Sequence, residues 1–292
     1  MNALLLAYKP PFISSNGFLA QIKRSYNTSK AGFSGTLDPF AQGSLLIATG
    51  VYTKLLPFIK TEPKVYEATL WLGASSLSLD IENIEKVDST PPLESSFVRE
   101  VMESFVGEIA YTPPAFSAKK VQGKRAYQLA RSGQSVELPP TTMHIYALDF
   151  LCYAHPFISF RACVSKGSYI RSLGSLIAQK LGHIGTLSAL KRVSEGDLVA
   201  QWGKIIELDP LKTLPYPTLP INPRYKEHFY HGRKLTRNDL DSSVQARVDL
   251  DKNPRYIVQF DEFFSIIQLH RDGSISYLLN RIDYAHTLQK AR

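Results

Sequence analysis

The sequence has few of the residues from which metal centres, disulfide frameworks or membrane spans are built. Its two cysteines, Cys152 and Cys163, lie in the apolar stretches FLCYAHPF and ISFRACVS without metal-ligand spacing. We expect reduced cysteines in the core, and a disulfide between neighbouring strands is the less favoured alternative. The seven histidines are scattered from His144 to His286. With no phosphate-binding loop, dinucleotide fingerprint or Ser-His-Asp arrangement either, the sequence predicts neither a metal nor a cofactor.

Long apolar runs are also absent. The N-terminal run ALLLAY, residues 3–8, follows no basic region and is too short for a signal peptide or a membrane span. Since Pro10 and Pro11 end it, we expect a buried first strand in a cytoplasmic protein that does not contact membranes.

Charge is the first positive signal. The 292 residues carry a formal net charge of +8, whereas the apolar content of 44% is ordinary for a globular protein. A chain of this length forms one large domain plus a small one. The excess of cations favours a polyanionic partner, either a nucleic acid or an acidic membrane surface.

Periodicity predicts a mixture of helices and strands. Helices are expected at residues 14–26, 93–109 and 172–182, the second with Phe97, Val101 and Phe105 on its buried face. Alternating residues predict a half-buried strand at 64–73 and two antiparallel strands within 143–164.

Composition divides the chain. We expect a catalytic domain at 1–210, with a basic segment at 112–142, and a proline-rich linker at 211–223. Residues 224–292 then form a small β domain, in which Asp272-Gly273 marks a hairpin.

A glycine-rich loop, AGFSGTLDPFAQG, precedes the apolar run SLLIATG. Asp38 stands before Pro39, which biases its backbone toward extended geometry. An acid on such a loop can be aimed rigidly into a cleft. Taken alone, however, an Asp-Pro pair is more often a simple turn former.

The whole segment GFSGTLDPFAQGSLLIATG resembles the signature of TruB-type pseudouridine synthases. Further blocks follow in the order of that family: YKPPFISSN, KVYEATLWLG, PPAFSAKKVQGKRAYQLAR, SKGSYIRSLGSLIAQKLG and LSALKRV. The resemblance covers roughly residues 3–195. It implies an α/β (α+β) fold whose mixed, mainly antiparallel central sheet is flanked by helices, followed by a small PUA-like β domain.

The resemblance assigns catalytic roles to Asp38, Tyr66 and Arg171. Asp38 becomes the nucleophile, Arg171 keeps it ionised, and Tyr66 stacks on the extruded uracil. Without the resemblance, a core tyrosine and a surface salt bridge are the favoured interpretations of Tyr66 and Arg171. Tyr169 and Leu190 are expected to line the same pocket.

Two loop residues depart from the family pattern. Phe33 stands where a histidine is usual, so we expect it to act by stacking or wedging against the substrate, without the hydrogen bonds of a histidine. Phe12 stands where a glycine is usual.

The remaining substrate contacts fall in basic blocks. The segment at 112–142 resembles the family's RNA-gripping thumb, although a solvated helix face is the plainer interpretation of such a charge run. Lys191 and Arg192 are expected to extend the RNA footprint. The residues predicted to bind RNA are Lys9, Lys119, Lys120, Lys124, Arg125 and Tyr127.

The resemblance implies conversion of uridine 55 in the T loop of tRNA into pseudouridine, on a base turned out of its stack. We expect a monomer that acts on the T-arm without a protein partner. Two alternatives stay open: a tRNA-folding chaperone, and a guide-RNA-dependent enzyme of the same superfamily.

Overall fold

The computed structural model describes residues 1–117, 119–121, 123–134, 136, 138–236, 240 and 255–284. The chain forms two compact units. The large unit consists of Leu5–Ile47 and Lys60–Glu207, and the small unit of Met1–Leu4, Ala48–Ile59 and Leu208–Arg292. The predicted domain limits at 210 and 224 remain a prediction.

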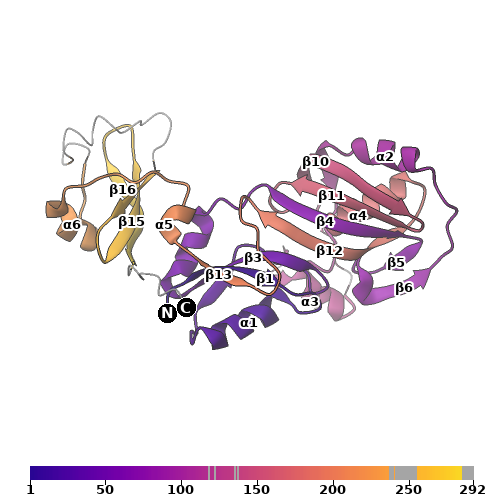
Figure 1. Ribbon diagram of the computed structural model, residues 1–292, viewed down its shortest axis with the longest axis horizontal. Coiled ribbons are helices and arrows are strands. Elements are labelled where there is room, and N and C mark those ends of the chain that lie inside the picture. Colours follow the sequence, from indigo (N-terminus) through magenta and orange to yellow (C-terminus); the bar gives the residue numbers. More distant parts are fainter. Residues whose placement is uncertain are drawn as a thin grey trace. The chain divides into compact units, whose positions relative to one another are not determined.

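A mixed sheet organises the large unit (Figure 1). Its order is β13-β1-β3-β12-β4-β11-β10-β7, and β2 pairs with β3. The strands of this sheet are β1 (Leu4–Lys9), β2 (Ala31–Phe33), β3 (Gln42–Thr49), β4 (Lys64–Leu72), β7 (Gly107–Tyr111), β10 (Thr141–Ala154), β11 (Phe157–Val164), β12 (Gly185–Glu195) and β13 (Ile205–Leu208).

Most of the pairings are antiparallel. β4 pairs with both β12 and β11, and β10 pairs with β11 and β7, all antiparallel, whereas β3 and β12 run parallel. This confirms the predicted mixed, mainly antiparallel sheet. The predicted strand at 64–73 is β4, and its alternate residues from Lys64 to Leu72 are buried, as strand periodicity requires.

Two helices cover one face of this sheet. They are α2 (Ser95–Glu103) and α4 (Ile170–Lys180), which contact β10, β12, β4 and each other (Figure 1). The helix expected at 93–109 is confirmed only for Ser95–Glu103, since residues 107–109 belong to β7, and its predicted buried face is partly wrong. Phe97 is 43% exposed, and α2 instead buries Val98, Val101 and Met102. These three lie at i, i+3 and i+4, so they share one side of the helix.

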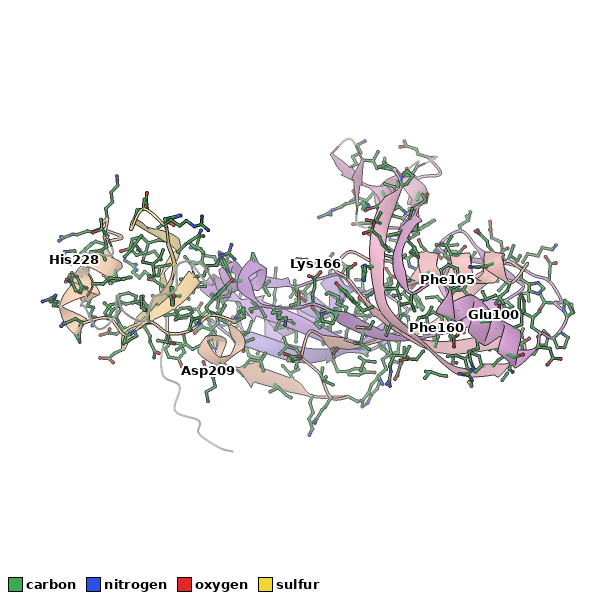
Figure 2. All side chains as sticks on the ribbon, turned by 90° about the horizontal axis from the view of Figure 1, so that it is seen from above. Glu100, Phe105, Phe160, Lys166, Asp209 and His228 are labelled. Atoms are coloured by element: carbon green, nitrogen blue, oxygen red, sulfur yellow. The ribbon has the colours of Figure 1, made fainter. Side chains whose placement is uncertain are left out.

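The first predicted helix is α1 (Ser15–Ser25), and Ser14 caps it by accepting a hydrogen bond from the amide of Gly17. The remaining elements of the large unit are short. They are β5 (Ala74–Ser76), the 3-10 helix η2 (Ile81–Asn83), β6 (Ile84–Val87), β8 (Lys120–Val121), β9 (Lys124–Arg125) and α3 (Ala126–Arg131). The segment that carries β8, β9 and α3 projects from the sheet (Figure 2).

In the small unit, β14, β15 and β16 form an antiparallel sheet. The predicted hairpin is confirmed: Asp272 accepts hydrogen bonds from Ser274, and Gly273 has a φ of +81°. The elements of this unit are η1 (Gly50–Phe58), α5 (Pro210–Thr213), η3 (Pro223–Tyr225), α6 (Lys226–Tyr230), β14 (Arg255–Gln259), β15 (Phe263–Leu269) and β16 (Ile275–Asp283).

The expectation of core cysteines is wrong. Cys152 and Cys163 are free thiols, the first exposed and the second half-buried. Their partners across the β10–β11 ladder are Ser159 and Ala147, so the two thiols are not opposite one another. Apolar neighbours in sequence misled the prediction, because alternate strand residues point to opposite faces.

Among the described residues, no helix combines the length and the apolar character needed to cross a bilayer.

Candidate active site

Asp38 lies on the loop that joins β2 to β3, and the start of α1 fixes this loop. The Ser15 hydroxyl donates to the carbonyl oxygen of Leu37 at 2.8 Å, and the Leu37 amide donates back to the same hydroxyl at 2.9 Å. This reciprocal pair fixes both the position and the orientation of the Leu37 peptide. The backbone at Asp38, the next residue, is therefore fixed independently of the contacts that the Asp38 side chain makes.

Arg171, at the start of α4, contacts the Asp38 carboxylate with two of its nitrogens. Its Nε lies 2.7 Å from Oδ2, and its Nη2 donates to Oδ1 at 2.9 Å. Nη2 thus makes a hydrogen bond to the carboxylate, whereas Nε makes a close ionic contact without hydrogen-bond geometry. The Arg171 side chain is 2% exposed and that of Asp38 is 27% exposed, so the pair is buried on the arginine side and open on the carboxylate side. The structure thus brings together the two residues that the sequence predicted to be partners.

A second carboxylate lies behind the same arginine. Nη1 of Arg171 is 3.4 Å from Oδ2 of Asp80 and donates to the Ser78 carbonyl oxygen at 2.5 Å, while Nη2 also donates to the Phe116 carbonyl oxygen at 2.8 Å. The Ser78 hydroxyl donates to Asp80 at 2.6 Å. Burial nevertheless raises the pKa of Asp80, and the charge of Arg171 acts in the opposite direction. Asp80 and the Ser78 carbonyl thus hold Nη1 of the guanidinium, and Nε and Nη2 are left facing Asp38.

Lys9 lies behind the Asp38 loop and not on an RNA-facing surface, so its predicted role in binding RNA is wrong. The residue is fully buried, and its ammonium group donates to the carbonyl oxygens of Pro10, Ile13 and Pro39 at 2.9, 2.7 and 3.2 Å. Burial lowers the pKa of Lys9 to about 8, while the charge of Asp38 acts in the opposite direction. Because Pro39 directly follows Asp38, Lys9 is a positioning residue for the carboxylate.

Replacing Lys9 tests this role. In Lys9→Met, the carbonyl of Pro39 loses its donor and the Asp38 loop loses its anchor from behind. We expect kcat to fall by about 10- to 100-fold, since small displacements of a reacting group have effects of this size. We expect the KM for the substrate to change little, because Lys9 is not at the surface. A raised KM with unchanged kcat would contradict the assignment.

The carboxylate opens into a cavity of about 270 Å³. All of its lining residues belong to the large unit. They come from the Asp38 loop, β4, β12 and the turn before α4: Ser34, Gly35, Thr36, Leu37, Asp38, Lys64, Tyr66, Lys166, Gly167, Ser168, Tyr169, Ile170, Leu190 and Arg192. The predicted pocket residues Tyr66, Tyr169 and Leu190 are thus on the same cavity as Asp38.

Tyr66 forms part of the cavity floor. Burial raises its pKa, and the charge and hydrogen bond of Arg192 act against this rise. Tyr66 on β4 and Arg192 on β12 are direct partners across the antiparallel ladder. Arg192 is itself fixed, because it donates to the carbonyl oxygens of Ser44 and Gly35 at 2.7 and 3.1 Å. The fixed guanidinium of Arg192 therefore lowers the pKa of the Tyr66 phenol, against the effect of burial.

Glu195 is the carboxylate that pairs with the cations beside Tyr66. It is fully buried, and its Oε1 lies 2.6 Å from Nη2 of Arg192. Its Oε2 accepts from Lys64 at 3.1 Å and from the Ser34 hydroxyl. One carboxylate thus pairs with two buried cations and compensates the charge of only one of them. The excess of positive charge beside Tyr66 suits a site that receives an anionic substrate.

Sequence reasoning missed Lys64, and it assigned Arg192 to the RNA footprint without connecting it to the cavity. Strand periodicity contained the signal for both. Lys64 precedes Tyr66 by two residues on β4, and Arg192 follows Leu190 by two residues on β12. Side chains two residues apart lie on the same face of a strand. The predicted pocket residues Tyr66 and Leu190 therefore imply that Lys64 and Arg192 face the same side of the sheet.

Other predicted contacts lie away from the cavity. Phe33 is half-buried on β2 and does not line the cavity, so its predicted stacking role stays a prediction. On the projecting segment, Lys124 and Arg125 are exposed, Lys119 and Tyr127 are half-buried, and the backbone of Lys120 pairs with that of Arg125.

Comparisons with known proteins place the chain in a family. The family model described as "TruB family pseudouridylate synthase (N terminal domain)" matches residues 23–170. The chain is 47% identical over 293 residues to the tRNA pseudouridine synthase B of Helicobacter hepaticus, covering 100% of this chain and 99% of that protein. It is 49% identical over 284 residues to the protein of that name from Nitratiruptor sp., covering 97% and 98%. Among solved structures, a chain of a Cbf5-Nop10-Gar1 complex superposes with a TM-score of 0.64 at 20% identity, covering 97% of this chain and 84% of that one.

Proposed function

The chain belongs to the TruB family of pseudouridylate synthases, and from this premise we propose that it converts uridine 55 in the T loop of tRNA into pseudouridine. The observation that carries the proposal is the Asp38–Arg171 pair, which presents a partly exposed carboxylate to a cavity. Relatives that match the chain over almost its whole length are named as synthases that act on tRNA. We infer the same class of substrate for this chain.

The reaction is an isomerisation and needs no added reactant. The bond between ribose C1′ and uracil N1 breaks, the base turns, and C1′ rejoins the base at C5. N1 gains a proton and C5 loses one, so atoms and electrons balance without a redox step. The protein must supply an anionic oxygen near C1′ and a group that accepts the C5 proton.

Asp38 supplies the anionic oxygen. The two contacts from Arg171 orient one edge of the carboxylate, and the open side leaves room for a ribose. The same oxygen serves either attack on C1′ or a route through a glycal, and both routes need the carboxylate.

Tyr66 is suited to the last step of the reaction, in which C5 loses its proton. Its ring forms a flat apolar surface against which a uracil stacks, and we assign its ionised phenolic oxygen as the acceptor of the C5 proton. The neighbouring Arg192 stabilises this phenolate, and the transfer converts it into the neutral phenol. Leu190 and Ile170 supply the apolar walls, and Tyr169 lines the same space.

The uridine reaches this cavity only if it leaves the stacked T loop, which costs a few kcal/mol. Contacts to the RNA backbone must offset that cost. The projecting segment presents Lys124 and Arg125 in exposed positions on β9. We propose that this segment holds the T-arm, that the protein acts as a monomer, and that it works in the cytoplasm.

Salt dependence tests the role of the projecting segment. In Lys124→Ala and in Arg125→Ala, we expect the KM for tRNA to rise and kcat to change little. Each variant is expected to reduce the slope of log affinity against log salt by about one, as the loss of one phosphate contact does. Lys86→Ala, which removes an exposed cation from β6, is the charge-matched control. Equal slopes in all four proteins would rule out phosphate contacts by these two residues.

The function itself is tested by incubating the protein with unmodified tRNA and mapping pseudouridine at nucleotide resolution. We expect a single new pseudouridine at position 55, and none in a transcript that carries cytidine there. Folded protein that yields no product at this position would overturn the assignment.

A further inference from the structure

Phe12, in the turn between β1 and α1, is unusually exposed. It is 72% exposed, the highest value among the large apolar side chains that the structure describes. An aromatic ring in water forgoes the stabilisation that burial provides. Its position therefore calls for a partner that the isolated protein does not contain.

The backbone at Phe12 is also unfavourable. Its φ is +60°, a left-handed conformation that residues with a Cβ rarely adopt and that glycine adopts freely. The flanking turn does not relax, because Lys9 is hydrogen-bonded to the carbonyl oxygens of Pro10 and Ile13. The chain thus holds a bulky ring rigidly at a point where glycine fits better. Strain of this kind, combined with exposure, is typical of ligand-contacting residues.

The turn that carries Phe12 is joined to the catalytic loop at two points. Lys9 donates both to Ile13, the residue after Phe12, and to Pro39, the residue after Asp38. Ser15 exchanges two hydrogen bonds with Leu37, the residue before Asp38. The segment that carries Phe12 is therefore hydrogen-bonded to the loop of the nucleophile and cannot shift independently of it.

We propose that Phe12 is a substrate-binding residue whose ring stacks on an RNA base next to the nucleotide that enters the cavity. This inference rests on the proposed RNA substrate. Removal of one base from a stack leaves the faces of its neighbours exposed, and an aromatic side chain covers such a face whatever the base. Phe33, the other aromatic residue considered for this role, does not line the cavity and is half-buried on β2.

The test compares Phe12→Gly, Phe12→Ala and Phe12→Trp in tRNA modification kinetics. We expect the KM of the glycine and alanine variants to rise by about 5- to 100-fold, the range that corresponds to one lost base-stacking contact. We expect kcat to change by less than about threefold, because Asp38 and its anchors are untouched. Phe12→Trp should restore the wild-type KM, since tryptophan also offers an aromatic face.

Thermal unfolding separates this role from a structural one. Phe12→Gly should unfold at the wild-type temperature or above, because glycine relieves the strain at this φ. Phe97→Ala, which truncates an exposed aromatic residue on α2, is the matched control and should keep the wild-type KM. An unchanged KM in Phe12→Gly overturns the inference, and so does a KM in Phe12→Trp that equals that of Phe12→Ala. If the wild-type protein does not modify tRNA at all, the proposed function fails first.

Discussion

Arg171→Met is expected to lower the free energy of unfolding by about 3–5 kcal/mol at neutral pH, because it removes one partner of a buried ion pair. The arginine is 2% exposed and is the cation that the structure places between Asp38 and Asp80. Methionine fills a similar volume but leaves the Asp80 carboxylate buried beside the negative charge of Asp38. It also leaves the Ser78 and Phe116 carbonyl oxygens without the donor they now have. We expect product formation to fall at least about 10³-fold, since Asp38 is no longer aimed.

The pH dependence of this loss has a defined sign. Burial already raises the pKa of Asp80, and Arg171 opposes the rise, so removing the arginine raises that pKa further. A carboxyl group with a raised pKa in the folded state favours folding when it is protonated, and this contribution is lost as the pH rises. The difference in stability between wild type and Arg171→Met should therefore be smaller at about pH 5 than at about pH 8.

Urea unfolding at these two pH values measures the effect. Arg171→Lys is the matched control, because it keeps the charge but loses the planar guanidinium with its several donors. We expect the lysine variant to retain more stability than the methionine variant while still losing most of its activity. A deficit in Arg171→Met that grows toward acid pH would contradict the assignment of Asp80 as the buried, destabilised carboxylate.

The sequence predicted the principal features of the site because they lie in contiguous motifs. Asp38 stands in a glycine-rich loop whose Gly43 has a φ of +116° and faces the Arg192 backbone so closely that a Cβ would lie 2.2 Å from its carbonyl oxygen. Strand alternation located β4, and with it Tyr66. Motif order then paired Asp38 with Arg171, residues that are 133 positions apart.

What the sequence did not reveal depends on long-range packing. Lys9 was predicted to bind RNA because it lies in the block YKPPFISSN that resembles the family, whereas the fold buries its ammonium group among three carbonyl oxygens. Glu195 was not identified at all, because its role arises only when β12 lies beside β4 and brings it to Lys64. The exposure of Phe97 and Cys152 was missed because periodicity defines a face but not which of two neighbouring residues occupies its centre.

Asp38→Asn is the variant with the largest expected effect on activity. The amide preserves the size and shape of the side chain but carries no negative charge and is a very poor nucleophile. We expect the rate of pseudouridine formation to fall by about 10⁴-fold or more, the range seen when an essential catalytic group is removed. Since Arg171 keeps Asp80 as its ion-pair partner, we expect the variant to fold.

The same variant separates catalysis from RNA binding. No contact that we assign to RNA involves the Asp38 charge, so unmodified tRNA should bind Asp38→Asn with nearly wild-type affinity. Retained binding together with retained refolding of tRNA would support an additional role as an RNA-folding chaperone. Loss of binding would show that the carboxylate also contributes to docking.

The most direct measurement is therefore a single-turnover time course of pseudouridine at position 55, with wild-type protein or Asp38→Asn in excess over unmodified tRNA. We predict complete conversion by the wild type and no detectable product from the variant over the same period, although both bind the RNA. Conversion by Asp38→Asn at a rate within about tenfold of the wild type would show that the carboxylate held by Arg171 is not the reacting group.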